Sequence, residues 1–331
     1  MGMTFFLFFC AAALIYVSCE YFVNAVEWVG HQFGISKTAT GTVLAAFGTA
    51  LPESVVTFVA VVFGQDAAQK EIGIGAAIGG PLVLATIAYA VIGWIFFNSK
   101  MATSAQFISQ PVAKDLLRDQ KWFMAIFVVK VALGLIAFAY KPWLGILFLV
   151  AYAAYVRHEL SRQADVGQTH ELEPLKIRPK LANPPRMWAV LQIIFALIAI
   201  YIGSQVFVHQ LESIGPWLGL SPQMVALLLA PVATELPEIL NAVIWVRQGK
   251  QDLAFANISG AMMIQATIPS ALGIFFTPWM LQPPLVWAAV MTMVSILGIY
   301  FLLNRGTLGA KQLRLFLVPY GVFAVGLIWF A

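Results

Sequence analysis

Long apolar stretches occupy most of this 331-residue chain and leave little room for any other kind of structure. A helix needs about 20 apolar residues to cross the roughly 30 Å hydrocarbon core of a bilayer. Hydrophobic residues make up 61% of the chain and charged residues only 10%, which is more apolar surface than one water-soluble core can hide. The sequence therefore predicts an all-α integral membrane protein with ten transmembrane helices. The expected spans are 4–29, 36–64, 71–97, 121–140, 142–160, 187–211, 222–248, 252–277, 283–303 and 311–330.

Basic residues are distributed unevenly between the ends of these spans. If successive spans alternate in direction, sixteen Lys and Arg residues fall on one side of the membrane, and two, Lys70 and Lys141, fall on the other. Basic residues concentrate in cytoplasmic loops. We therefore expect the 161–186 loop in the cytoplasm and both termini outside, in the inner membrane of a prokaryotic cell. The charges are scattered among span ends, so they form no face for nucleic acid.

The chain contains two copies of one pattern. A shift of 185 residues aligns 22–64 with 207–249 without a gap, and 14 of the 43 positions are identical, glycines and acids included. Each copy lies in a half of the chain that contains five spans. Because five is an odd number, the two halves cross the membrane in opposite directions. Inverted repeats of this kind place a substrate site near the bilayer midplane. We expect two inverted five-helix repeats, 1–160 and 187–331, joined by a cytoplasmic linker at 161–186.

Two matched prolines fall near the middle of the second and seventh spans, in GTALPES at 48–54 and ATELPEI at 233–239. Proline removes a helical hydrogen bond at a cost of about 3 kcal/mol. We expect both helices to bend or unwind at Pro52 and Pro237. Freed backbone groups are tolerated at membrane depth only where they line a cavity or face protein. The two prolines therefore predict an interior site.

A glutamate follows each proline, and the second copy carries an additional acid, Glu235. A carboxylate at the centre of a spanning helix costs about 2.5–3.5 kcal/mol, so these acids need protons, a basic partner or a bound metal ion. Lys130 is the only basic residue far from the ends of an expected span, so one lysine is too few to pair with three acids. Hard divalent cations take about six to eight oxygen ligands. The candidate metal ligands are Glu53, Glu238, Thr49, Thr234, Glu235 and Asn257.

The paired stretches at 48–54 and 233–239 resemble the alpha-repeat signatures of the sodium/calcium exchanger family, in the calcium/cation antiporter superfamily. This resemblance implies a core of eight helices holding the ion site, with helices one and six sliding across it to alternate access. It also implies that Glu53 and Glu238 are the central calcium ligands. Thr49 and Thr234 would contribute further oxygens. No cofactor is implied beyond the transported ions, and the partners expected are inorganic cations and lipid, with no obligatory protein partner.

The chain departs from the family pattern at several ligand positions. Where the family has serine after the threonine, this chain has Ala50 in one copy and Glu235 in the other. The family's GNxxGSN becomes GAAIGGP at 75–81 and ANISGAM at 256–262, and only Asn257 keeps its side-chain oxygen. The lost positions help to coordinate sodium in the family. Buried carboxylates can exchange a proton for a metal ion, so Glu235 makes proton coupling an alternative.

The function favoured by these residues is a secondary antiporter that exchanges a divalent cation, with Ca²⁺ first among the candidates, for Na⁺ or H⁺. The alternatives are a proton-coupled exchanger of Mg²⁺, Mn²⁺ or Na⁺, and a relative that no longer transports, because Mg²⁺ and Mn²⁺ also take oxygen ligands. A cation channel would need a ring of pore residues, and none is visible. No pair of catalytic aspartates, no serine–histidine pair and no zinc motif is present, so we do not expect an enzyme.

Overall fold

A computed structural model provides the structure of the protein. It describes residues 2–36, 39–64, 67–98, 108, 110–161, 172–181, 183–217, 227–228 and 230–328. Within these ranges it does not describe the side chains of residues 51–53, 55–56, 59, 67–69, 72, 98, 110–111, 208, 211–212, 215–216 and 230. Every regular element in the described part of the chain is a helix. The all-α prediction is confirmed.

The first half of the chain forms five spans, three of which are single or nearly continuous helices. The first span is α1 (Gly2–Gln32), the fourth is α6 (Gln110–Leu135), and the fifth begins with the 3₁₀ turn η5 (Lys141–Leu144) and continues as α7 (Gly145–Leu160). The second and third spans contain π-helical turns. They consist of η1 (Thr40–Ala45), α3 (Ala46–Phe58) and η2 (Val59–Phe63), then α4 (Ala67–Val83), η3 (Leu84–Ala88) and α5 (Tyr89–Asn98).

The second half also begins with a long helix followed by a broken span. Its elements are α8 (Arg186–Trp217), α10 (Ala230–Thr234), α11 (Leu236–Arg247), α12 (Gln251–Phe276), α13 (Pro283–Asn304), α14 (Ala310–Arg314) and α15 (Leu317–Leu327). The described parts of all ten expected spans fall on helices or on runs of short helices. The fold consists of ten membrane-spanning helices in two inverted five-helix repeats. The exact limits of the repeats and of the linker stay a prediction.

Five helices in the described part of the chain are long and apolar enough to cross a bilayer on their own. Three of them differ sharply in burial: 83% of the apolar window of α12 is buried inside the protein, against 22% for α1 and 28% for α8. Apolar side chains that face outward on a membrane protein contact lipid tails, which are as apolar as leucine. Thus α12 lies in the core of the bundle, whereas α1 and α8 present most of their surface to lipid.

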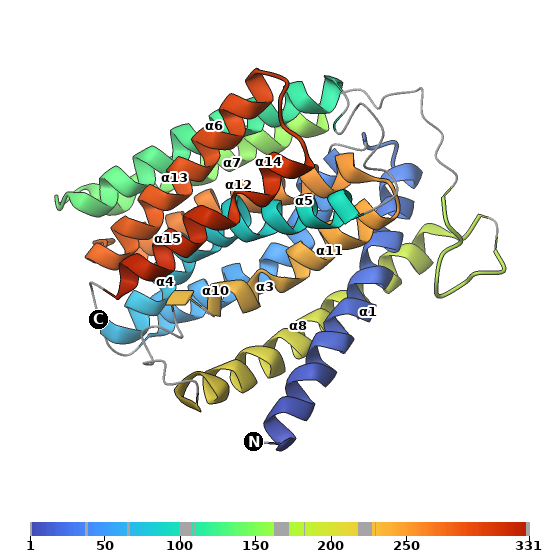
Figure 1. Ribbon diagram of the computed structural model, residues 1–331, viewed down its shortest axis with the longest axis horizontal. Coiled ribbons are helices and arrows are strands. Elements are labelled where there is room, and N and C mark those ends of the chain that lie inside the picture. Colours follow the sequence, from blue (N-terminus) through green and yellow to red (C-terminus); the bar gives the residue numbers. More distant parts are fainter. Residues whose placement is uncertain are drawn as a thin grey trace.

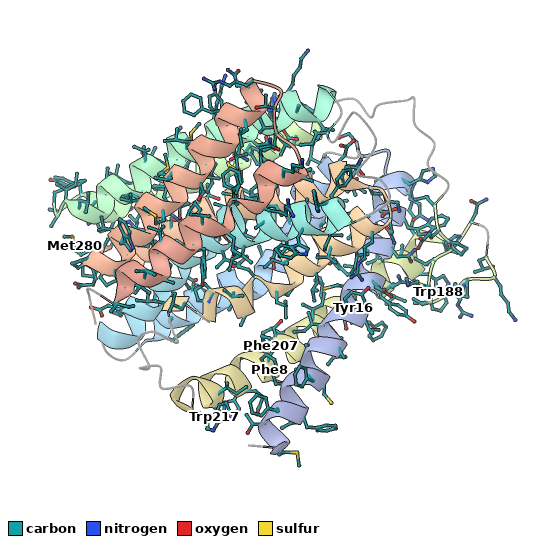
Figure 2. The ribbon with its side chains drawn as sticks, in the orientation of Figure 1. Phe8, Tyr16, Trp188, Phe207, Trp217 and Met280 are labelled. Atoms are coloured by element: carbon teal, nitrogen blue, oxygen red, sulfur yellow. The ribbon has the colours of Figure 1, made fainter. Side chains whose placement is uncertain are left out.

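Helices α1 and α8 pack against each other along one side of the bundle (Figure 1). Phe8 of α1 and Phe207 of α8 stack between them, with ring centroids 4.3 Å apart, as Figure 2 shows. Near the ends of the two helices, Phe5 meets Trp217 edge to face at 5.7 Å. Stacked and edge-to-face aromatic pairs each add about 0.5–1.5 kcal/mol to the packing. Helices α1 and α8 are therefore packed tightly together, and the two lie as one unit against the remaining eight spans.

Part of the linker forms an ordered segment on this pair of helices. We call this segment the strap, residues 172–181 and 183–185. Its backbone oxygens accept hydrogen bonds from α1: Trp28 Nε1 donates to Glu173 O at 2.9 Å, and Gln32 Nε2 donates to Pro184 O at 2.9 Å. Leu175 is completely buried in a small apolar cluster with side chains of α1 and α8. The linker is therefore packed against the protein along the strap.

Asn24 of α1 lies at the centre of the contacts between the strap and the two helices. Its Nδ2 donates to Pro174 O at 3.3 Å, and its Oδ1 accepts from Lys176 N and from Gln192 Nε2 of α8, both at 3.0 Å. One amide therefore joins α1, α8 and the strap. A buried amide that loses its partners costs about 1–3 kcal/mol, so this contact fixes the position of the strap.

We expect Asn24→Ala to loosen the strap. Loss of about 1–3 kcal/mol raises the open fraction of a locally unfolding segment by roughly five- to a hundred-fold. Trypsin should then cleave faster after Lys176 or Lys180 in purified protein. Asn304→Ala, at an exposed residue that ends α13, is the matched control and should leave the cleavage rate unchanged. Equal rates in both variants would show that Asn24 does not hold the strap.

Candidate functional site

The seventh span is interrupted where the sequence places the second acidic motif. Helix α10 ends at Thr234 and α11 begins at Leu236, while Glu235 between them has φ −85° and ψ 0°. Pro237 falls in the first turn of α11, where its missing N–H leaves no helical hydrogen bond unmade. Glu238 also lies in this first turn, where the helix dipole favours a negative charge. The expected unwinding at Pro237 is confirmed.

The second span does not unwind at its matched proline. Helix α3 runs from Ala46 to Phe58 without interruption at position 52, and the irregularity lies in the π-helical turns η1 and η2 on either side. Of the two expected outcomes at Pro52, a bend or an unwinding, the helix therefore does not unwind. A π-helical turn absorbs one extra residue, so strain from a proline can be taken up beside it without breaking the helix.

Several helices meet at Glu238. It is 1% exposed, and its Oε2 has no hydrogen-bond partner among the described residues. The Thr49 hydroxyl of α3 lies within hydrogen-bonding range of its carboxyl group, and Asn257 Nδ2 of α12 donates to its backbone oxygen at 3.4 Å. On the other side, Cys19 Sγ of α1 is 3.8 Å from Pro237 O. Helices α1, α3, α11 and α12 therefore converge at Glu238.

Glu235 lies beside Glu238 and is completely buried. Its Oε2 accepts a hydrogen bond of 2.7 Å from Gln265 Nε2 on α12. Two carboxyl groups thus share one interior region, which raises the cost of leaving both charged without a cation. Gln265 was not among the predicted ligands, and the structure gives it a direct contact with an acid.

The threonines and Asn257 take up different positions relative to the acids. Thr49 is buried, and its hydroxyl donates to Ala45 O at 3.1 Å in its own span as well as lying near Glu238. Thr234 is half-buried, and its hydroxyl donates to Pro231 O at 3.1 Å. Asn257 is completely buried, and its Oδ1 has no partner among the described residues. The backbone of Glu53 lies in α3, but its side chain falls outside the described residues.

Asn241 is a candidate ligand that the sequence did not single out. It lies one turn beyond Glu238 on α11, is completely buried, and neither Oδ1 nor Nδ2 has a hydrogen-bond partner among the described residues. Buried polar atoms without partners are costly unless a water molecule or an ion completes them. The sequence signal was its position three residues after Glu238, which puts both side chains on the same face of a helix. Together with Glu238 Oε2 and Asn257 Oδ1, Asn241 Oδ1 is available to a hard cation.

The side chains that the structure describes do not form a complete metal site from acids alone. Among them, no group of three or more His, Cys, Asp or Glu residues is placed to hold a metal ion. In a metal site here, Glu235 and Glu238 would supply two carboxylates, and the remaining oxygens would have to come from an amide, a hydroxyl and backbone carbonyls. Such a mixed set is typical of Ca²⁺ ligands, which combine carboxylates with carbonyl and amide oxygens.

A second buried polar cluster lies between α6, α7 and α12. Arg118 contacts Glu159 Oε1 at 2.5 Å, Asp115 Oδ1 at 3.4 Å and Asp119 Oδ1 at 3.6 Å. Ser259 of α12 donates to Asp119 Oδ2 at 3.0 Å. From the sequence, Arg118 counted only among the sixteen basic residues near span ends on one side. The structure makes it the centre of an ion-pair network that joins α6 and α7 to the core helix.

Ten helices in inverted halves, with buried acids at the break in one of them, define a membrane transporter of the cation antiporter class. The sodium/calcium exchanger protein family model matches residues 3–160 and 188–329, and the chain belongs to this family. It is similar to the inner membrane protein YrbG of Escherichia coli (26% identity; 86% of this chain, 84% of that protein). It also resembles the membrane protein MJ0091 of Methanocaldococcus jannaschii (23% identity; 95% of this chain, 94% of that protein).

Solved structures of the sodium-calcium exchanger NCX_Mj share this fold. One, from a crystal soaked with 2.5 mM Na⁺ and 10 mM Sr²⁺, has a TM-score of 0.76 at 19% identity and covers 98% of both chains. Another, soaked with 2.5 mM Na⁺ and 0.1 mM Ca²⁺, has a TM-score of 0.75 at 20% identity. The family consists of transporters, which places the chain among transporters rather than enzymes.

Proposed function

We propose that this protein is a secondary antiporter that exchanges a divalent cation, Ca²⁺ first, for Na⁺ or H⁺ at a site between the two halves. The observation that carries the proposal is the surroundings of Glu238. Its buried carboxylate has an oxygen without a hydrogen-bond partner among the described residues, next to Glu235 and the Thr49 hydroxyl. A buried carboxylate pair of this kind is stable with a bound cation or with protons, and exchange between the two is antiport.

The proposed ligands are Glu53, Glu238, Glu235, Thr49, Thr234 and Asn257, with Asn241 added from the structure. Support is strongest for Glu238, Glu235 and Asn257, which are all buried in one region. Thr234 is the weakest member, because its hydroxyl already donates to Pro231 O. Glu53 enters through its match to Glu238 in the repeat.

Proton coupling is the second candidate, and the residues on α4 favour it. Ala76, Gly80 and Pro81 lie where the family has side-chain oxygens, so this helix offers fewer ligands to a sodium ion. Glu235 supplies a group that can carry a proton in exchange. The proposed topology follows from the basic residues: the strap side is cytoplasmic and both termini are outside, in a prokaryotic inner membrane.

Flux into reconstituted vesicles tests the proposal. Vesicles that contain the purified protein should accumulate ⁴⁵Ca²⁺ when an outward Na⁺ gradient or an outward H⁺ gradient is imposed, and the gradient that drives uptake identifies the coupling ion. Protein-free vesicles and vesicles with the gradient collapsed by an ionophore are the controls. Inhibition of ⁴⁵Ca²⁺ uptake by added Mg²⁺ or Mn²⁺ would reveal another preferred cation. Ca²⁺ entry that needs no opposing gradient would indicate a channel, and no flux under any gradient would indicate a relative that no longer transports.

A further inference from the structure

Two prolines outside the repeated motif free backbone oxygens in the interior of the bundle. Pro81 lies inside α4 and Pro269 lies inside α12, and both helices continue past them. Because proline has no N–H, the carbonyl four residues earlier loses its helical partner. These two carbonyls belong to Ala77 and Gln265. Both helices lie in the core, so their freed oxygens face protein rather than water.

The side chain of Lys130 reaches both of these freed oxygens. Lys130 projects from α6 and is completely buried. Its Nζ donates to Ala77 O at 2.8 Å and lies 3.5 Å from Gln265 O. The ammonium also lies 4.8 Å from the centre of the Phe127 ring, whose face attracts cations. A single positive charge therefore bridges α4 and α12 at the points where their proline residues interrupt the hydrogen-bond ladder.

This position is continuous with the proposed ion site. Gln265, whose backbone oxygen faces the ammonium, donates through its side chain to Glu235 Oε2 at 2.7 Å. One residue thus connects the lysine to an acid of the site. Transporters with broken helices commonly coordinate Na⁺ through backbone carbonyls released at the break. An ammonium group and Na⁺ carry the same charge and both bind carbonyl oxygens.

We propose that Lys130 is a resident cation, whose ammonium fills the position between α4 and α12 where a Na⁺ ion would otherwise bind. This inference rests on the proposed antiport function, because it assigns one cation position of that site. The fixed charge offsets part of the negative charge of Glu235 and Glu238. The transporter then needs one mobile monovalent cation fewer to neutralise them. Lys130 is thus a specificity-determining residue that excludes Na⁺ from this position.

The test compares Lys130→Gln with Lys130→Arg. Glutamine removes the charge and offers an oxygen, whereas arginine keeps the charge. Thermal unfolding of the purified proteins is measured as NaCl is raised, with choline chloride as the control for ionic strength. A ligand that binds only the folded state raises Tm in proportion to the logarithm of its concentration once it exceeds its Kd. We expect Lys130→Gln to gain a Na⁺-specific rise in Tm, steeper than that of the unaltered protein, and Lys130→Arg to behave like the unaltered protein.

Equal Na⁺ responses in the unaltered protein and Lys130→Gln would overturn the proposal, as would a gain of the same size in Lys130→Arg. If Lys130→Gln folds poorly, the yield of folded protein is measured instead of Tm. NaCl during purification should then increase the folded fraction on size-exclusion chromatography, and choline chloride should not. Equal yields in the two salts would also overturn it. This readout needs no transport, so an absence of Ca²⁺ flux would reject the proposed function without deciding the role of Lys130.

Discussion

Replacing Glu238 with glutamine is expected to abolish divalent-cation exchange while the protein still folds. Glutamine has nearly the same shape, and the neutral group costs less to bury than a carboxylate, so the helices around it stay packed. Removing one charge from a buried set of interacting charges costs about 3 kcal/mol or more. Since each 1.4 kcal/mol is about tenfold in affinity, cation binding should weaken at least roughly 100-fold. The measurements are ⁴⁵Ca²⁺ uptake into vesicles and, for folding, the elution profile and Tm.

Glu20→Gln provides the matched control for this substitution. Glu20 lies on α1, its side chain is 35% exposed, and its Oε2 is 3.4 Å from Lys176 Nζ in the strap. Exposed ion pairs contribute about 0–1 kcal/mol, so its loss should leave both exchange and folding close to normal. Glu53→Gln is expected to match Glu238→Gln, because the two acids correspond in the repeat. Full exchange in Glu238→Gln would remove the central role that we assign to this acid.

The second large effect is expected from Gly260→Ala, which should prevent stable folding. Gly260 lies on α12 where the helix crosses η1, and a Cβ there would overlap the backbone carbonyl of Thr42. Gly41 of η1 also lies close to α12, because a Cβ on Gly41 would be 2.6 Å from the Cβ of Ala256. Overpacking costs about 1–3 kcal/mol where side chains can adjust. A backbone carbonyl cannot turn aside, so we expect at least the upper end of this range.

Gly75→Ala, on helix α4, is the matched control. Among the described residues, no atom outside its own helix lies within 4 Å of a Cβ built on Gly75. Alanine also has a higher helix propensity than glycine, by about 1 kcal/mol. Gly75→Ala should therefore keep or raise Tm, whereas Gly260→Ala should lower Tm or the yield of folded protein. Similar Tm values in the two variants would show that α12 and η1 can separate without cost.

The fold was predictable because its main signals are local and repeated. Stretches of about 20 apolar residues mark each span, and the match between 22–64 and 207–249 gives the inverted halves. The expectation that each matched proline bends or unwinds its helix was less reliable. Pro237 sits at the start of a new helix, whereas α3 passes position 52 and takes up its irregularity in π-helical turns. Propensity gives the local cost of a proline, but neighbouring turns decide how the chain absorbs it.

The site was predictable only in part. Glu238, Glu235 and Asn257 could be proposed from the sequence because an acid or a lone amide within an apolar span is costly without a partner. Asn241 was missed, although its distance of three residues from Glu238 places it on the same helix face. The Arg118 cluster was missed because its members come from three helices that are far apart in the sequence.

The sequence by itself determined the membrane class, the ten spans, the inverted halves and which acids lie within apolar spans, since each follows from the cost of placing a given residue in lipid. Only the tertiary structure decided which groups meet. It directed the ammonium of Lys130 to carbonyls freed by prolines on two other helices, and it folded the strap onto α1 and α8. Hydrogen bonds act over about 3 Å, so partners separated by 50 or more residues are set by helix packing and not by local pattern.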